Sequence, residues 1–215
     1  MLKTVVVFDS GFGGELFADY IEDKVPVFEV IRVIDWRHSS EINKNPRLAR
    51  KCAAKALRPY IGRVDVIVFA NYLLSMTSLG YFRRKFKNQK FVGFEFQKPH
   101  QRQTTLVLTT NAVLKTIPFH LATFGRKTIP AALDGWPELI DDGELNPLFV
   151  RHHLVGYKTF KPKKVYLACT QFADIKPIIH QIFGPTVGIH DGYRDTLSQL
   201  CHILRLRGLD GRKKK

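Results

Sequence analysis

Short apolar runs alternate along the chain with longer segments in which apolar residues recur at helical spacing. The runs lie at residues 5–8, 27–34, 66–69, 91–94, 105–108, 165–167 and 187–189. Because they are apolar at consecutive positions, they predict strands buried on both faces. The helical spacing is clearest at 46–61 and at 195–208, where Gly208 would end the second helix. Buried strands that alternate with helices predict a mostly parallel sheet covered on both sides, a doubly wound α/β fold.

Small and polar residues gather directly after these runs. The segments are DSG at 9–11, DWRHSS at 35–40, ANY at 70–72, TTNA at 109–112, ACTQ at 168–171 and HDG at 190–192. Ligands of such folds bind outside the carboxyl ends of the strands, so these segments are the candidate site. In the last of them, Asp191 is expected to cap the final helix.

The glycines at 11, 13 and 14 allow a tight turn from the first strand into a helix, with backbone N–H groups facing the ligand. Leu16 breaks the Gly-x-Gly-x-x-Gly pattern of dinucleotide sites, and no Lys-Ser or Lys-Thr of a P-loop follows. A small anionic ligand such as a carboxylate is therefore expected here.

Composition narrows the class of protein. The 215 residues are 45% hydrophobic, with no apolar tract of membrane-spanning length and no signal peptide before the first strand, so a cytoplasmic protein is expected. The net charge of +15 is spread over 83–90, 158–164 and the last five residues. It predicts a solvated basic surface, with weak polyanion contact as the alternative. The three cysteines lack Cys-x-x-Cys spacing, which indicates neither a disulfide framework nor a structural zinc site.

Several segments resemble the glutamate racemases and the wider aspartate/glutamate racemase superfamily, in the family's order. VVVFDSGFGG at 5–14 resembles the first strand with its Asp-Ser-Gly. DVIVFANYLLS at 65–75 resembles the strand that ends in Ala-Cys-Asn-Thr, and VYLACTQF at 165–172 the strand that ends in Gly-Cys-Thr-His. TTNAVLKTIPF at 109–119 is similar to a Gly-Thr-x-Ala-Thr segment, and PELIDDG at 137–143 to an acidic loop.

The resemblance implies two pseudo-symmetric α/β lobes, placed here at 1–93 with 186–215 and at 94–185. It also implies proton transfer at the carbon next to a carboxylate, without metal or organic cofactor, on an amino acid or small dicarboxylate. In the family one thiolate removes the proton and an opposite thiol returns one. Amino-acid metabolism, a link to the cell wall and a possible homodimer follow from the same resemblance.

Only part of the family's machinery is present. Asp9, Ser10, Asn71, Cys169 and Thr170 match, and Thr110 lies in the similar segment. The departures are Ala70 for the first cysteine, Tyr72 for the Thr after Asn71, Val113 for the second Thr of its segment and Gln171 for the His. No Pro-Tyr-Gly follows Asp35. The resemblance therefore implies Cys169 and Asp9 as catalytic residues, with Ser10, Asn71, Thr110, Thr170 and Gln171 binding the substrate.

Ala70 cannot exchange a proton, so two-thiol racemisation is doubtful and three interpretations stay open. One is an enzyme with a single thiol, in which Asp9 or Tyr72 serves the other face. Cys52 and Cys201 lie in helical patterns and are expected to be ordinary buried cysteines. Another is a catalytically degenerate protein that binds a carboxylate or a partner protein. The third is a basic accessory protein that acts on nucleic acid or its enzymes, since some glutamate racemases interact with DNA gyrase.

Overall fold

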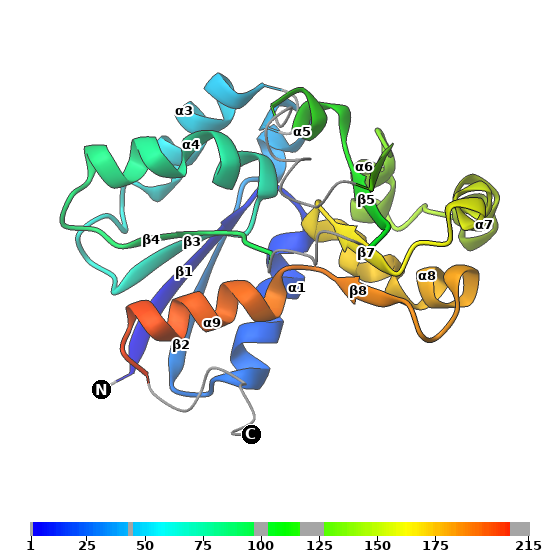
Figure 1. The fold of residues 1–215 in the computed structure, drawn as a ribbon. Coiled ribbons are helices and arrows are strands. Elements are labelled where there is room, and N and C mark those ends of the chain that lie inside the picture. Colours follow the sequence, from blue (N-terminus) through cyan, green and yellow to red (C-terminus); the bar gives the residue numbers. More distant parts are fainter. Residues whose placement is uncertain (1, 43–44, 97–102, 117–126, 207–215) are drawn as a thin grey trace. The chain divides into compact units, whose positions relative to one another are not determined.

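The computed structural model of the chain describes residues 2–42, 45–96, 103–116 and 127–206 (Figure 1). It divides into two compact units, the first made of Met1–Phe96 and Gly192–Lys215 and the second of Gln97–Asp191. Within the described ranges, no helix combines the length and the apolar character needed to cross a membrane.

The first unit is built on a parallel four-stranded sheet in the order β2-β1-β3-β4. Its strands are β1 (Lys3–Asp9), β2 (Phe28–Ile34), β3 (Val66–Phe69) and β4 (Phe91–Gly93). Its helices are α1 (Phe12–Lys24), η1 (Trp36–His38), α2 (Ser39–Ile42), α3 (Pro46–Leu57), α4 (Tyr72–Lys85) and α9 (Tyr193–Ile203). Each of the central strands β1 and β3 has a run of four fully buried apolar residues, which is why the sheet needs helices on both faces.

Those helices form two layers in Figure 1, with α3 and α4 on one face of the sheet and α1 and α9 on the other. On the α3–α4 side, Phe8 and Phe69 pack with Ala53, Leu57 and Phe82 in one buried cluster. The α1–α9 side is aromatic, because the ring of Phe17 lies 5.2 Å from Phe94 and 5.1 Å from Tyr193. These two cores fix the carboxyl ends of β1 and β3, where the candidate residues of this unit lie.

The second unit repeats the construction with the parallel order β6-β5-β7-β8. Its strands are β5 (Thr105–Thr109), β6 (Thr128–Ala132), β7 (Lys164–Leu167) and β8 (Gly188–His190). Its helices are α5 (Asn111–Thr116), α6 (Trp136–Asp141), α7 (Pro147–Leu154), η3 (Val155–Phe160), η4 (Thr170–Ile175) and α8 (Lys176–Phe183). In both sheets the first strand in the chain lies second in the order, so the two units share one topology.

The doubly wound α/β fold predicted from the apolar runs is therefore confirmed, and the runs coincide with seven of the eight strands of the described residues. The strand that the pattern missed is β6. It lies at the edge of its sheet and contains Pro130, which has no N–H to give to a ladder. The expected lobe boundary near residue 186 also differs from the structure, since β8 pairs with β7 and so lies in the second unit.

The expected ends of the last helix need correction. Helix α9 begins after Gly192, which has a φ of 78° and no side-chain cap. Asp191 instead forms an ion pair with Lys176. The helix ends at Ile203, and Gly208, expected to end it, lies outside the described residues.

Candidate functional site

In the first unit, three of the residues expected from the sequence meet at the carboxyl ends of β1 and β3. Asp9 and Ser10 have no exposed surface, and Asn71 is 5% exposed. Asp9 Oδ1 accepts hydrogen bonds from the backbone N–H of Ser10 at 2.7 Å and from Nδ2 of Asn71 at 3.1 Å. Nδ2 of Asn71 also lies 3.4 Å from Oγ of Ser10. The result is a polar cluster held inside an apolar core, in which donors surround the carboxylate.

Local sequence explains how this cluster is held. Asn71 is the N-cap of α4, and its Oδ1 accepts the N–H of Leu74 at 2.9 Å. Oγ of Ser75 donates to the carbonyl of Asn71 at 2.7 Å. Gly14 in α1 lets the helix approach the strand, since a Cβ built there would lie 2.5 Å from Cβ of Asp9. These contacts leave the Asp9 side chain little freedom.

The residues that flank Asn71 are buried apolar or aromatic side chains. Ala70, which stands where the family has its first cysteine, has no exposed surface. Tyr72 is 6% exposed, and its ring lies 5.2 Å from that of Phe96. Burial raises the pKa of Tyr72 well above the usual range of a phenol. The phenol is therefore neutral at physiological pH and packs like a core side chain.

In the second unit, Cys169, Thr170 and Gln171 follow β7 at the start of η4. The register brings this strand end beside that of β5, because the N–H of Ala168 donates to the carbonyl of Leu108 at 2.8 Å. Thr110, the residue after β5, is partly buried and lies at this edge, while Val113 is buried in α5. The arrangement of strand ends thus matches that of the first unit.

The Cys169 thiol has a defined hydrogen-bond acceptor. Its Sγ lies 3.0 Å from Oε1 of Gln171, which also accepts from Oγ1 of Thr170 at 3.3 Å. Thr170 and Gln171 are each 2% exposed, and Cys169 is partly buried. Nε2 of Gln171 is buried and has no hydrogen-bond partner among the residues that the structure describes. A buried N–H donor without a partner is costly, so the amide is suited to receive an oxygen of a ligand beside the thiol.

The two other cysteines differ from one another. Cys201 is fully buried in α9, as its helical pattern predicts. Cys52 is partly buried and packs against the buried cluster on the α3–α4 side, so the expectation of a core cysteine holds in part. Cys52 also belongs to a group with Asp35 and His38. Each of the three offers one atom that could bind a metal ion, and these atoms lie within 4.8 Å of one another. Sequence spacing did not reveal this group, because helix α3 brings Cys52 to the turn that follows β2.

Comparison with known proteins finds glutamate racemases both by sequence and by fold. No protein-family model matches the chain. A glutamate racemase of Clostridium perfringens is 27% identical over 97% of this chain and 85% of its own length. A second, from Pseudomonas putida, is 25% identical over 95% of this chain and 83% of its own length.

Solved structures agree. Glutamate racemase from Escherichia coli, crystallised with L-glutamate and an activator, has a TM-score of 0.82 and 22% identity over 96% of this chain and 84% of its own. By sequence and by fold, the chain is similar to the glutamate racemases of the aspartate/glutamate racemase superfamily. Glutamate racemase from Campylobacter jejuni has the same fold, with a TM-score of 0.79 at 19% identity over 99% of this chain and 90% of its own.

This glutamate racemase-like protein keeps the family's Asp-Ser-Gly at the end of β1, Asn71 after β3 and Cys-Thr after β7. The residues that differ from the family's pattern lie at the same strand ends, with Ala70 after β3 and Gln171 after β7. Among the described strand ends, Cys169 is the residue that carries a thiol.

Proposed function

We propose that this protein transfers a proton at the carbon next to a carboxylate of a small amino acid or dicarboxylate, with Cys169 as its one catalytic thiol. The observation that supports this most is the contact between the Cys169 thiol and the buried amide of Gln171. Glutamate is the first candidate substrate, because a similar fold was crystallised with L-glutamate. Asp9 is the second catalytic residue of the proposal, and Ser10, Asn71, Thr110, Thr170 and Gln171 bind the substrate.

In the proposed reaction the Cys169 thiolate takes the proton from the α carbon, which leaves the electron pair on an enediolate of the substrate carboxylate. Return of a proton from the same thiol restores the starting enantiomer. In heavy water the returned atom is deuterium, so the net change is exchange of one hydrogen without inversion. Inversion would require a proton on the opposite face, and Asp9 is the candidate donor, since it is an ionisable group next to Ala70.

Gln171 fits the role of a neutral partner for this thiol. Its Oε1 accepts the S–H of the resting thiol, and a rotation of the amide would let its N–H groups donate to the thiolate. Donors aimed at developing negative charge lower the barrier to forming an enediolate, and removal of one typically costs about 10²–10³-fold in rate. Glutamine cannot supply a proton itself, so this face of the substrate depends on the thiol alone.

Deuterium exchange at the α carbon, followed by proton NMR in heavy water, tests this proposal. The compounds are D- and L-glutamate, D- and L-aspartate and a substituted malonate, and the proteins are the native chain, Cys169→Ala and Cys201→Ala. We expect exchange in the native protein and in Cys201→Ala and none in Cys169→Ala. Exchange that survives in Cys169→Ala would contradict the role of this thiol.

Absence of exchange with every compound would favour the alternative, a racemase-like protein that binds a carboxylate without turning it over. Calorimetric titration with the same compounds then measures binding directly. Weak polyanion contact is tested by binding to duplex DNA at two salt concentrations, because phosphate contacts weaken steeply with salt. Sedimentation of the same preparation tests the homodimer.

A further inference from the structure

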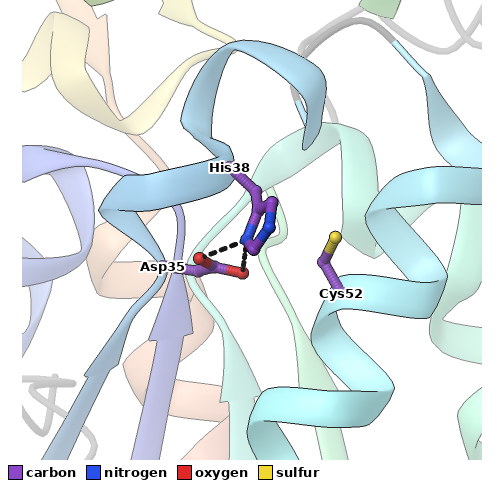
Figure 2. A group of neighbouring side chains, drawn as sticks. All are labelled: Asp35, His38 and Cys52. Atoms are coloured by element: carbon purple, nitrogen blue, oxygen red, sulfur yellow. Dashed lines mark hydrogen bonds and ion pairs between the residues drawn. The ribbon is translucent and has the colours of Figure 1, made fainter.

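The turn after β2 carries a group of side chains that the proposed proton transfer does not use. Asp35 follows the last residue of the strand, and its N–H donates to the carbonyl of Asp9 at 2.9 Å. The short helix η1 then brings His38 back over Asp35, with Nδ1 at 2.8 Å and 3.0 Å from the two carboxylate oxygens. Figure 2 shows the imidazole between this carboxylate and the thiol of Cys52.

Cys52 reaches the group from a separate helix whose start is well defined. Asn45 caps α3 by accepting the N–H groups of Arg47 and Leu48, and Pro46 occupies the first turn. The helix presents Cys52 on the same side as Lys51 and Lys55, which line one cavity together with Asp35 and His38. The cavity has a volume of about 630 Å³, so the group lies at the wall of an open space.

We propose that Asp35, His38 and Cys52 bind one Zn²⁺ ion and leave one coordination position open to the cavity. A carboxylate oxygen, an imidazole nitrogen and a thiolate sulfur are the three ligand types that zinc takes in proteins. Sites with three protein ligands keep the fourth position for water or another small ligand. This inference is independent of the proposed proton transfer, since neither Cys169 nor Asp9 takes part.

The distances require only a local adjustment. The three donor atoms lie within 4.8 Å of one another, and donor atoms of a tetrahedral zinc site are about 3.3–3.8 Å apart, given bonds of about 2.0–2.3 Å. Rotation of the partly buried Asp35 and His38 side chains, which line the cavity, can close that difference while Cys52 stays packed in α3. Nδ1 of His38 and Oδ1 of Asp35, which now form a 2.8 Å hydrogen bond, would separate by about 0.5–1 Å to bind the same ion, or His38 would bind through Nε2.

Charge is compatible with a dication. The Asp35 carboxylate and a Cys52 thiolate together neutralise Zn²⁺. Lys51 and Lys55 add two positive charges, but both side chains are exposed, so water screens their repulsion of the ion. The same two lysines would favour an anionic oxygen as the fourth ligand. If no metal binds, Lys51 and Lys55 would instead balance the charge of the Asp35 carboxylate. The zinc titration below distinguishes these two cases.

Zinc titration of the full chain, after removal of metal by EDTA and with the cysteines reduced, tests the site. Competition with a chromophoric chelator gives stoichiometry and affinity for the native chain, Cys52→Ser, His38→Ala and the matched thiol control Cys169→Ser. We expect one Zn²⁺ per native chain and an affinity at least about 100-fold lower in Cys52→Ser and His38→Ala, since even outer-shell partners are worth about 10–100-fold. Cys169→Ser should bind like the native chain.

Cobalt supplies the second readout. Co²⁺ bound by a thiolate gives a charge-transfer band in the near ultraviolet, which should be present in the native chain and in Cys169→Ser and absent in Cys52→Ser. Circular dichroism of each variant establishes that it is folded. The proposal is overturned if the native chain binds no Zn²⁺ in competition with the chelator, or if folded Cys52→Ser and His38→Ala bind it as tightly as the native chain does.

Discussion

Asn71 binds Asp9 with one end of its amide and helix α4 with the other. Its Nδ2 lies 3.1 Å from Oδ1 of Asp9, and its Oδ1 lies 2.9 Å from the N–H of Leu74. One side chain therefore both starts a helix and holds the carboxylate at the end of β1. Stability and site geometry are coupled at this position.

Asn71→Ala should lower the free energy of unfolding by about 3 kcal/mol. Loss of the cap accounts for about 1 kcal/mol, and loss of a donor to a buried carboxylate for about 1.5–3 kcal/mol. Asn45→Ala is the matched control, because Asn45 caps α3 at an exposed position without a buried partner, and it should cost about 1 kcal/mol. Urea unfolding measures both, and equal losses would mean that the Asp9 contact contributes nothing.

Gly14→Ala should destabilise the fold, although alanine favours helices. The added Cβ would lie 2.5 Å from Cβ of Asp9 and 2.7 Å from Cδ1 of Ile34, and overpacking of this kind costs about 1–3 kcal/mol. Gly80→Ala is the control within α4, where the new Cβ meets only the end of the Arg84 side chain at 3.3 Å. It should stabilise by up to about 1 kcal/mol. A stable Gly14→Ala variant would show that α1 can move away from β1.

Tyr72 gives the protein an alkaline instability. Burial raises its pKa in the folded state above the ordinary value of 10.0, so above that pH the unfolded chain ionises first and gains stability. The free energy of unfolding should fall with rising pH in this range, by about 1.4 kcal/mol for each pH unit above 10 until the folded-state pKa is reached.

Comparison of the native chain with Tyr72→Phe isolates this contribution. Urea unfolding gives the free energy of unfolding at pH 8 and at pH 11. The loss between these two pH values should be about 1.4 kcal/mol smaller in Tyr72→Phe than in the native chain. Tyr157→Phe removes a phenol that is only partly buried, and should follow the native protein. Identical pH dependence in all three proteins would contradict the effect of burial at Tyr72.

Ala70→Cys should convert hydrogen exchange into inversion, if the proposed function is correct. The new thiol would stand where the family has its first cysteine, and a placed acid or base contributes about 10²–10⁴-fold. We expect the ratio of inversion to exchange to rise at least about tenfold, measured by product chirality alongside deuterium content. Ala70→Ser has nearly the same shape without a thiol and should leave the ratio unchanged. A folded Ala70→Cys that exchanges without inversion would place the missing group elsewhere.

The strands were predictable because each central one is apolar at consecutive positions, as at Val66–Phe69. The edge strand β6 was not, since an edge tolerates Pro130 and needs fewer apolar residues. The rule that parallel strands end at one edge placed Asp9 and Asn71 in one candidate site, but their hydrogen bond came only from the structure. The group of Asp35, His38 and Cys52 was not predictable, because it depends on the angle at which α3 packs, which no local pattern encodes.

The first unit is assembled from the two ends of the chain. Thr196 Oγ1 in α9 accepts the N–H of Glu95 at 3.0 Å, and Tyr193 covers the ring of Phe17 at 5.1 Å. During synthesis on the ribosome, the whole of the second unit emerges before α9 does. The aromatic face of the first sheet therefore stays uncovered until the second unit and α9 have been translated. Nascent chains stalled before Tyr193 would expose Phe17 to chaperones, so the synthesis of α9 decides when the first sheet is protected from aggregation.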